Sequence, residues 1–248
     1  MQPCFIAGFN SVSHVVRRFP GLCVKMYCSG STHSRCSRML EESGCKAVSL
    51  VSVSAAELDG LVPGVVHQGV VLAMKHLPSV SLSDLLQWCD KKQEPCTVLI
   101  LDQVQDPQNV GACLRSAAAF GVEAVIVPDR NAVAMTTTVA KVSCGACALV
   151  PLIVVPNLVR AIEKLKAHNF WVYAASERGE SSVTDAPVDC SVVWVMGSEE
   201  KGIRPLVQKH CDRHFVIDVS DTFTTLNVAT ATGICLHQTF LRRKIAGY

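Results

Sequence analysis

Apolar and polar residues alternate in short helix-like and strand-like segments over residues 1–75. Apolar positions three or four apart predict helices, and short continuous apolar runs predict strands. The N-terminal part of the chain is therefore predicted to be a small α/β unit. Its predicted helices are residues 11–18, 32–43 and 55–61, and its predicted strands are residues 22–27, 46–51 and 69–74.

The segment from His76 to Pro95 is more polar than its surroundings, with Pro78, several serines and the charged run 91–95 around a short predicted helix at 82–89. Proline and polar clusters between patterned segments are typical of linkers. We therefore expect an N-terminal domain over residues 1–76, a linker over 77–95 and a second domain over 96–248.

Continuous apolar runs recur in the second domain, which is typical of strands covered on both faces. The predicted strands are residues 97–101, 124–127, 149–154, 171–175, 192–196 and 215–218, and predicted helices at 110–120 and 158–168 lie between them. This β-α alternation indicates an α/β fold with a parallel sheet and helices on both sides. Ligands of such sheets bind at the carboxyl ends of the strands.

The composition is that of an ordered globular protein, with 49% hydrophobic and 18% charged residues. No uninterrupted apolar run approaches the roughly 20 residues that a membrane helix needs, and the N-terminus lacks a secretory pattern. We expect a protein with no membrane partner, located in the cytoplasm, or in mitochondria if its source is eukaryotic. The net charge of +2 does not by itself indicate a nucleic-acid partner.

Thirteen cysteines are spaced irregularly through apolar segments, and the only C-x-x-C pair is Cys144 with Cys147. A structural zinc site of this kind needs a second pair of ligands at a matching distance. We expect neither a disulfide framework nor a metal site, and interpret this pair as small buried thiols on a helix face.

The first segment with candidate chemistry follows the strand at 97–101. Asn109 is predicted to cap the next helix, and Arg115 lies in the second turn of that helix. A guanidinium together with N–H groups at a helix N-terminus binds phosphate well. The alternatives are a surface salt bridge for Arg115 and a plain helix cap for Asn109.

The second segment follows the strand at 192–196 and is predicted to be a tight turn leading into a helix. Gly197 allows the backbone to approach a ligand closely. Glu199, two residues later, is placed to accept hydrogen bonds from hydroxyl groups of a ligand or substrate. The alternative interpretation of Glu199 is a carboxylate that stabilises a helix N-terminus.

The third segment follows the strand at 215–218 and is a polar loop that leads into a long apolar helix. Thr225 and Asn227 are placed to donate and accept hydrogen bonds at the start of that helix. Taken alone, this pattern predicts only a capped helix.

Together, and in this order, the three segments resemble the signature of the SpoU/TrmH branch of the SPOUT superfamily, whose members are RNA ribose 2′-O-methyltransferases. Residues 63–70, with the sequence PGVVHQGV, resemble the end of the N-terminal RNA-binding domain of that branch. The resemblance therefore spans essentially the whole chain, and it is strongest to bacterial enzymes that methylate guanosine in 23S rRNA. The residues that match the three motifs are Asn109, Gly111 and Arg115; Gly197, Glu199 and Gly202; and Thr225, Leu226, Asn227 and Val228.

This resemblance implies a SPOUT domain with a deep trefoil knot, preceded by a small L30e-like α/β domain. It implies a homodimer whose site is completed across the subunit interface, with large-subunit rRNA as the other partner. The implied cofactor is S-adenosylmethionine, bent in the knot and held largely by backbone groups. The corresponding positions are Met196, Gly197, Ile217, Leu226 and Asn227.

The implied reaction is methyl transfer to a ribose 2′-hydroxyl, a poor nucleophile that needs alignment and proton removal. Arg115 is the residue on which the reaction is expected to depend most. Because guanidinium resists deprotonation, we expect Arg115 to hold the adjacent phosphate, while that phosphate or a water takes the proton. Asn109, Glu199, Thr225 and Asn227 are then expected to position ribose and cofactor.

Two positions depart from the pattern of the family. Thr225 replaces the usual serine of the third motif, and Glu200 stands where many relatives have glycine. If position 200 requires a positive φ, the turn around it is expected to be strained. In the N-terminal domain, the candidates for contact with the RNA backbone are Arg17, Arg18, Arg35 and Arg38.

Three alternatives remain at the level of sequence. The first is a tRNA ribose methyltransferase, which the N-terminal α/β domain disfavours. The second is a ribosome-assembly factor that binds rRNA without methylating it, which the retention of Arg115, Glu199 and Asn227 disfavours. The third is a Rossmann-type oxidoreductase, which the lack of a glycine fingerprint after any strand disfavours.

Overall fold

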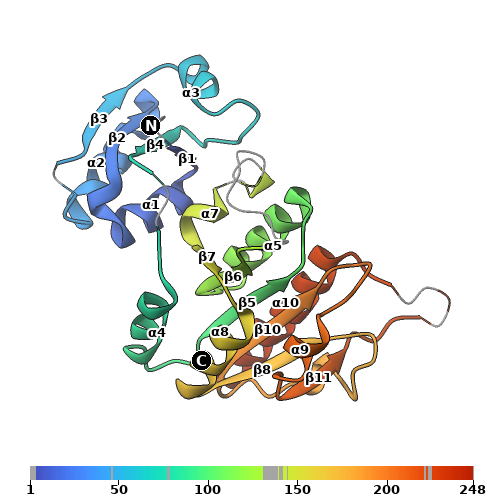
Figure 1. The fold of residues 1–248 in the computed structure, drawn as a ribbon. Coiled ribbons are helices and arrows are strands. Elements are labelled where there is room, and N and C mark those ends of the chain that lie inside the picture. Colours follow the sequence, from blue (N-terminus) through green and yellow to red (C-terminus); the bar gives the residue numbers. More distant parts are fainter. Residues whose placement is uncertain are drawn as a thin grey trace. The chain divides into compact units, whose positions relative to one another are not determined.

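The computed structural model describes residues 4–45, 47–76, 79–130, 139, 142–143, 145–220, 222 and 225–247. The chain divides into two compact units (Figure 1). The first comprises residues 1–78 and 144–149, and the second comprises residues 79–143 and 150–248.

The first unit is a four-stranded mixed sheet with helices packed against it. The strands are ordered β1-β4-β2-β3, with β1 and β2 antiparallel to β4 and with β3 parallel to β2. Apolar residues three or four apart on α1, at Val12, Val15 and Val16, are fully buried in its core. The elements are β1 (Cys4–Ala7), α1 (Phe9–Arg18), β2 (Cys23–Cys28), α2 (His33–Glu42), β3 (Ser49–Ser52), α3 (Ala55–Leu61), β4 (Val70–Met74) and α7 (Ala146–Leu149).

The second unit is built on a seven-stranded sheet in the order β7-β6-β5-β10-β8-β11-β9, and every neighbouring pair is parallel. The carboxyl ends of all its strands therefore lie along one edge. This confirms the predicted α/β class with a parallel sheet. The strands are β5 (Thr97–Asp102), β6 (Ala124–Pro128), β7 (Leu152–Val155), β8 (Phe170–Ala175), β9 (Ser181–Ser182), β10 (Ser191–Gly197) and β11 (Arg213–Val216).

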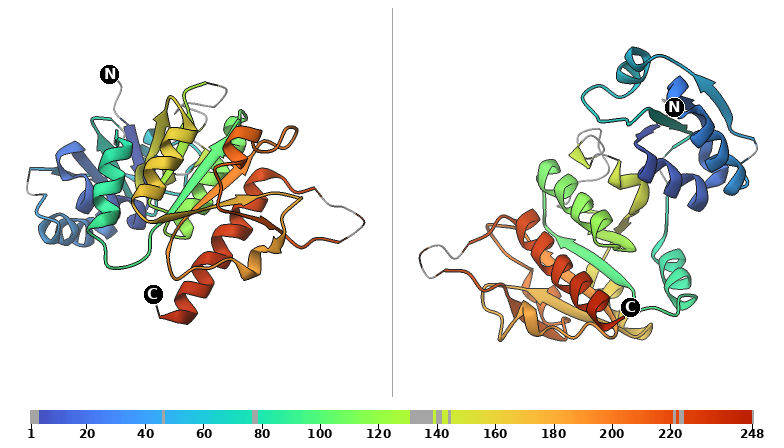
Figure 2. Two further views of the ribbon diagram at one scale, coloured as in Figure 1. Left: turned by 60° about the horizontal axis from the view of Figure 1, so that its bottom comes forward. Right: turned by 180° about the vertical axis from the view of Figure 1, so that it is seen from behind.

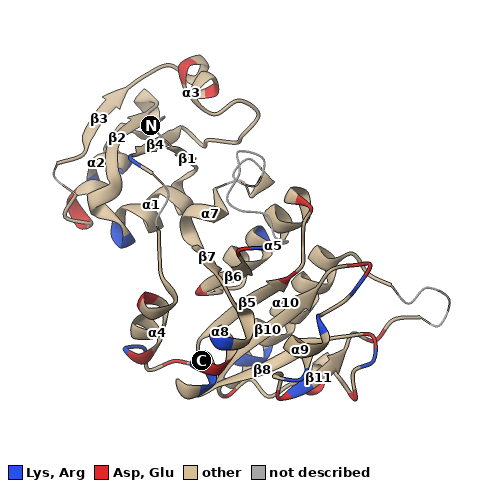
Figure 3. Ribbon diagram, viewed as in Figure 1, with Lys and Arg blue, Asp and Glu red and all other residues tan. Residues whose placement is uncertain are grey.

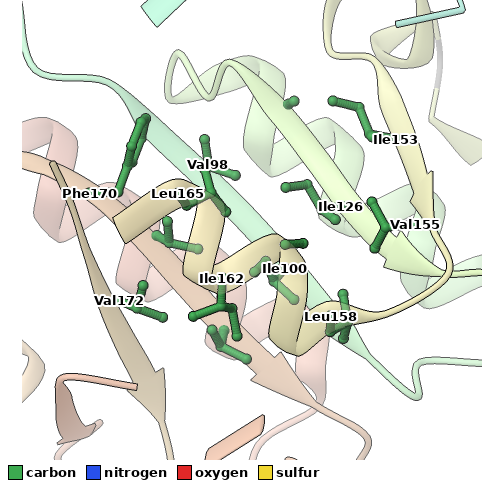
Figure 4. Packing of buried hydrophobic residues seen from close by; sticks show 14 of the residues in the cluster. Val98, Ile100, Ile126, Ile153, Val155, Leu158, Ile162, Leu165, Phe170 and Val172 are labelled. Carbon is green, nitrogen blue, oxygen red and sulfur yellow. The ribbon is translucent and has the colours of Figure 1, made fainter. Parts of the chain in front are cut away.

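Helices cover both faces of this sheet because alternate strand residues point to opposite sides. Val98, Ile100 and Val172 share one apolar cluster with Ile162 and Leu165 of α8 (Leu158–Ala167), as Figure 4 shows. The buried parts of α4 (Leu82–Asp90) and α9 (Pro205–Gln208) belong to the same cluster.

On the opposite face, α5 (Pro107–Ala119) lies beside α10 (Val228–Ala246), as Figures 1 and 2 show. The buried Trp194 of β10 donates a hydrogen bond of 2.9 Å from Nε1 to Thr239 of α10. Cys113 and Thr232 are in contact at 3.5 Å between the two helices. These contacts bring the first turns of α5 and α10 to the same end of the sheet as the carboxyl ends of β5 and β10.

Several local predictions need correction. The helix predicted at 110–120 is α5 and starts at Pro107, and the strand predicted at 46–51 is β3 and starts at Ser49. Leu149, predicted to start a strand, ends the short helix α7, and β7 begins only at Leu152. The strand predicted at 215–218 is β11 and ends at Val216. The helix predicted after Glu199 starts later, at Pro205. The strands β1 and β9 and the short helix α7 were not predicted. Of the C-x-x-C pair, Cys147 is buried on α7, and Cys144 lies outside the described residues.

Candidate active site

The three sequence motifs meet at the carboxyl edge of the second unit through three side chains. Asn109 lies in the first turn of α5, Glu199 in the turn after β10, and Asn227 at the N-cap of α10. Asn109 Nδ2 donates to Glu199 Oε1 at 3.3 Å, and Asn227 Nδ2 donates to Asn109 Oδ1 at 3.0 Å. Asn227 Nδ2 also donates to Glu199 Oε1 at 2.5 Å. Residues 90 and 118 positions apart thus form one hydrogen-bonded cluster.

Glu199 also stabilises the start of α10. The backbone N–H of Val228 donates to Glu199 Oε1 at 3.2 Å, while the side chain of Asn227 caps the same helix by accepting from Ala229 N–H at 2.9 Å. A carboxylate is favourable at a helix N-terminus because the dipole there is positive. Every hydrogen bond of Glu199 among the described residues uses Oε1, so Oε2 is the oxygen that remains for a ligand.

Asn109 is not the cap of α5, contrary to the prediction. Asp106 caps this helix by accepting from Gln108 N–H at 3.0 Å, and Pro107 occupies the first helical position. Proline fits there because its missing N–H would be unpaired in any case. Asn109 is therefore free to direct its amide toward Glu199 and Asn227.

The turn that carries Glu199 is closed by a backbone bridge between Ser198 and Gly202. A Cβ atom on Gly197 would lie 2.1 Å from the carbonyl carbon of Gly202, so glycine is required for this turn to fold back on itself. The backbone of Gly202 lies directly against Gly197; the approach of a ligand to the backbone of Gly197 stays a prediction. Glu200 has no positive φ; Gly202 adopts it, at 64°, and the predicted strain at Glu200 is absent.

A cavity of about 300 Å³ adjoins the cluster. Gln103, at one side of it, adopts a positive φ of 62°, a conformation that is uncommon for residues other than glycine and is found frequently at binding sites. No sequence pattern indicated Gln103, because the motif match begins only at Asn109. The cavity is lined by Gln103, Val104, Gln105, Asp106, Asn109, Ser198, Glu199, Glu200, Lys201 and Val228.

Arg115 and Thr225 do not join the cluster. Arg115 is exposed on α5, and six helical steps turn its side chain by about 120° from that of Asn109. Within the described parts of the chain, neither Arg115 nor Thr225 has a side-chain hydrogen bond or an ion pair, and neither lines the cavity. Both side chains are exposed.

The positions predicted to hold the cofactor lie along the carboxyl edge of the sheet. Gly197 ends β10, and Ile217 directly follows β11; these two strands flank β8. Leu226 directly precedes Asn227 and, like Ile217, is partly exposed. Met196 is only 3% exposed, so its side chain belongs to the core.

The arginines predicted to contact RNA lie on α1 and α2 of the first unit. Arg17 is 3.9 Å from Glu42, and the guanidinium of Arg35 lies 3.9 Å from the ring centre of Phe9. A second cavity, of about 470 Å³, lies along α1. It is lined by Asn10, Ser13, His14, Arg17 and Arg18. Arg38 does not line it.

Among the residues that the structure describes, no group of three or more His, Cys, Asp or Glu side chains is arranged to hold a metal ion. In the same residues, no helix combines the length and apolar character that crossing a membrane requires.

Comparison with known proteins identifies the class to which this fold and cluster belong. Residues 96–237 match the SpoU rRNA Methylase family. The chain is 36% identical over 240 residues to the 23S rRNA (guanosine-2′-O-)-methyltransferase RlmB of Coxiella burnetii, with 96% of each chain covered. It is also 36% identical to the RlmB protein of Bordetella pertussis, covering 96% of this chain and 97% of that protein. The chain belongs to the SpoU rRNA methylase family.

Solved structures agree on the fold. The SpoU methyltransferase AviRb of Streptomyces viridochromogenes, solved in complex with the cofactor AdoMet, superposes with a TM-score of 0.71 at 19% identity. The superposition covers 99% of this chain and 92% of AviRb. An AdoMet-bound rRNA methyltransferase from Sinorhizobium meliloti superposes with a TM-score of 0.66 at 19% identity, covering 98% and 87% of the two chains. These likenesses confirm the fold class; the predicted knot remains a prediction.

Proposed function

We propose that this protein transfers a methyl group from S-adenosylmethionine to the 2′-hydroxyl of a guanosine in 23S rRNA. The bacterial relatives that carry this activity in their names match the chain over 96% of its length, including the N-terminal unit. The observation that carries the proposal to this molecule is the contact of Asn109, Glu199 and Asn227 beside a cavity.

The residues at the carboxyl edge fit a nucleoside cofactor. Ile217 and Leu226 offer partly exposed apolar surface, and the cavity reaches Val228, two residues beyond Leu226. Gly197, Ile217, Leu226 and the backbone of Met196 are the groups we assign to holding it. When bound, S-adenosylmethionine supplies a methyl group on a positively charged sulfur.

Within the site, Asn109 and Asn227 fix Oε1 of Glu199, a residue that lines the cavity, and leave Oε2 for a ligand. We assign this oxygen to accept a hydrogen bond from a ribose hydroxyl, because an ionised carboxylate is an acceptor only. Orientation of a weak nucleophile by fixed groups lowers the barrier to its attack. Thr225, exposed beside Asn227, is assigned to the same task of positioning.

Arg115 is assigned to grip the phosphate next to the target ribose. Its guanidinium stays protonated and forms two parallel hydrogen bonds to phosphate oxygens, so the proton of the hydroxyl passes to that phosphate or to water. An Arg115→Lys variant that kept nearly full turnover and unchanged RNA affinity would contradict this role.

We also propose a homodimer in which Arg115 of one subunit serves the cavity of the other. Two observations support it: Arg115 points about 120° away from Asn109 on α5, and α10 exposes Phe240, Leu241 and Ile245 at 43%, 38% and 78%. A mixture of Arg115→Ala and Glu199→Gln subunits tests the exchange. Mixed dimers regain one intact site, whereas sites formed within one subunit regain none.

The first unit is proposed to bind rRNA, with domain limits at residues 1–76, a linker at 77–95 and the catalytic domain at 96–248. Helix α4 of this linker packs in the core of the second unit, and residues 144–149 belong to the first unit. Acidic residues of the first unit gather on α3 and at the end of α2, whereas Arg17, Arg18, Arg35 and Arg38 lie on α1 and α2 (Figure 3). The bacterial relatives favour the cytoplasm over the mitochondrial alternative as the place of action.

The deciding experiment incubates the purified protein with S-adenosylmethionine and protein-free 23S rRNA, 16S rRNA or tRNA, and maps 2′-O-methyl marks. We expect one guanosine mark in 23S rRNA, and the same mark formed at a strongly reduced but measurable rate with a Glu199→Gln variant. A mark only in tRNA supports the tRNA alternative. Binding of 23S rRNA with no mark in any substrate supports the assembly-factor alternative and refutes the proposal.

A further inference from the structure

Asp102 is a fully buried carboxylate at the carboxyl end of β5, with 0% of its surface exposed. Among the described residues, Arg204 donates every hydrogen bond that the Asp102 carboxylate accepts. The backbone N–H of Arg204 donates to Oδ2 at 2.9 Å, Nε donates to Oδ1 at 2.8 Å, and Nη2 lies 2.7 Å from Oδ1. A buried carboxylate without such partners is strongly unfavourable, so the chain is held at Arg204 by the need to satisfy Asp102.

The same Asp102 lies opposite Gly197 in the parallel pairing of β5 with β10. The turn of residues 198–203 therefore leaves the sheet beside Asp102 and returns to it at Arg204. Both ends of the turn are tied to one residue, by strand pairing at the start and by the ion pair at the end. Between these ends lies Glu199, whose Oε1 contacts Asn109 and Asn227.

We infer that the Asp102–Arg204 ion pair positions Glu199 for methyl transfer. It fixes the place of the 198–203 turn at the edge of the sheet and so holds Glu199 in contact with Asn109 and Asn227. The inference rests on the proposed role of Glu199. Asp102 directly precedes Gln103, and both Gln103 and residues 198–201 of the turn line the cavity. The ion pair therefore anchors two sides of the cavity.

A matched pair for comparison exists in the same unit. Glu123, 7% exposed, pairs with Lys92 at the start of β6, which is the amino edge of the sheet and opposite to the cluster. Glu123→Gln removes a buried carboxylate charge as Asp102→Asn does, but it leaves the turn at 198–203 untouched. A loss of turnover caused by general loosening of the unit appears with both substitutions; a loss caused by positioning appears only with Asp102→Asn.

The test measures kcat and KM of the full-length protein with 23S rRNA and S-adenosylmethionine for wild type, Arg204→Gln, Glu199→Gln and the double variant of these two. Asp102→Asn and its matched control Glu123→Gln are measured beside them. We expect Arg204→Gln to lower kcat by roughly 10- to 100-fold, the scale of a small misplacement of reacting groups. In the Glu199→Gln background the same substitution is expected to cost less than about twofold, because coupled residues are not additive. Glu123→Gln is expected to leave kcat within about twofold, as distant sites do.

If Arg204→Gln lowers kcat by the same factor in the wild-type and Glu199→Gln backgrounds, the inference is overturned and the role of Glu199 stays intact. Unchanged kcat for Glu199→Gln alone refutes the proposed site and the inference with it. If Arg204→Gln does not fold, Arg204→Lys replaces it, since lysine keeps a positive charge beside Asp102 but loses the fork geometry. Arg204→Lys is then expected to lower kcat clearly in the wild-type background and by less than about twofold in the Glu199→Gln background.

Discussion

Among the side chains at the end of α10, that of Arg243 is predicted to contribute most to the stability of the second unit. Its guanidinium is half buried and donates to four backbone carbonyls and one hydroxyl, all from two segments far from it in the sequence. Burial lowers its pKa from the usual arginine value, which shows that the charge is partly removed from water. The acceptors and distances are Val188 O at 2.9 Å, Pro95 O at 3.0 Å, Cys96 O at 3.3 Å, Cys190 O at 2.8 Å and Thr97 Oγ1 at 2.6 Å.

Replacing Arg243 with alanine removes all five hydrogen bonds. A hydrogen bond to a charged group contributes about 1.5–3 kcal/mol, but desolvation of the guanidinium and rehydration of the freed carbonyls offset most of that sum. We expect a net loss of about 3 kcal/mol, within the range of a broken buried network. For a domain of this size this corresponds to a decrease in Tm of roughly 6–12 °C.

The assay is thermal unfolding followed by circular dichroism, with Lys244→Ala as the matched control. Lys244 is the next residue, carries the same charge and is exposed, so its substitution is expected to change the free energy of unfolding by less than about 0.5 kcal/mol. If Arg243→Ala and Lys244→Ala unfold within 1 °C of each other, the hydrogen bonds of Arg243 contribute nothing net. The structural reasoning would then be wrong.

Gly197→Ala is expected to destabilise the protein by about 2–3 kcal/mol and to reduce methyl transfer, because its Cβ would overlap the backbone of Gly202; Gly233→Ala in α10 has room for a Cβ and is expected to stabilise it by about 0.5–1 kcal/mol. The free energies of unfolding of the two variants are measured in urea. Changes of opposite sign confirm the two predictions, and equal changes contradict them. Burial raises the pKa of Cys113 to about 11 and of Cys235 to about 12. Since the thiolate is the reactive form, iodoacetamide at pH 8 is expected to label both at least ~100-fold more slowly in the native protein than in urea, and mass spectrometry showing equal labelling rules this out.

The regular elements were predictable because their patterns are local. The helix at residues 55–61 was predicted with the bounds that the structure has, and β5, β6, β8 and β10 differ from their predicted bounds by one residue at most at either end. Each is a continuous apolar run or an amphipathic segment, and a window of a few residues carries the signal. The strand β9 was missed because two residues are too few for a pattern to emerge. The strand β1 was missed although β3 and β11, which also have four residues, were predicted.

The start of α5 shows how a local signal can be present and still be assigned wrongly. Asp106 followed by Pro107 is a helix start of the ordinary kind, an acidic cap with proline at the first position. The sequence interpretation gave the cap to Asn109 because the apolar pattern placed the start of the helix at Val110, directly after it. The structure separates the two tasks: Asp106 satisfies the helix, and Asn109 is released to bind Glu199.

The candidate site was predictable as a set of residues but not as a geometry. Taken locally, each of Asn109, Glu199 and Asn227 is a polar residue near a helix start. Nothing in the local sequence indicates that Glu199 Oε1 accepts hydrogen bonds from the side chains of Asn109 and Asn227 and from the backbone N–H of Val228. Asp102 and Arg204 carry no motif signal either, because their partnership spans 102 residues. The parallel pairing of β5 with β10 brings Asn109 and Asp102 close to Glu199 and Arg204, because it places the turns after both strands at one edge of the sheet. The chemistry of the site is therefore a property of strand order, and substitutions that preserve the motifs but shift the register of β10 are expected to abolish it.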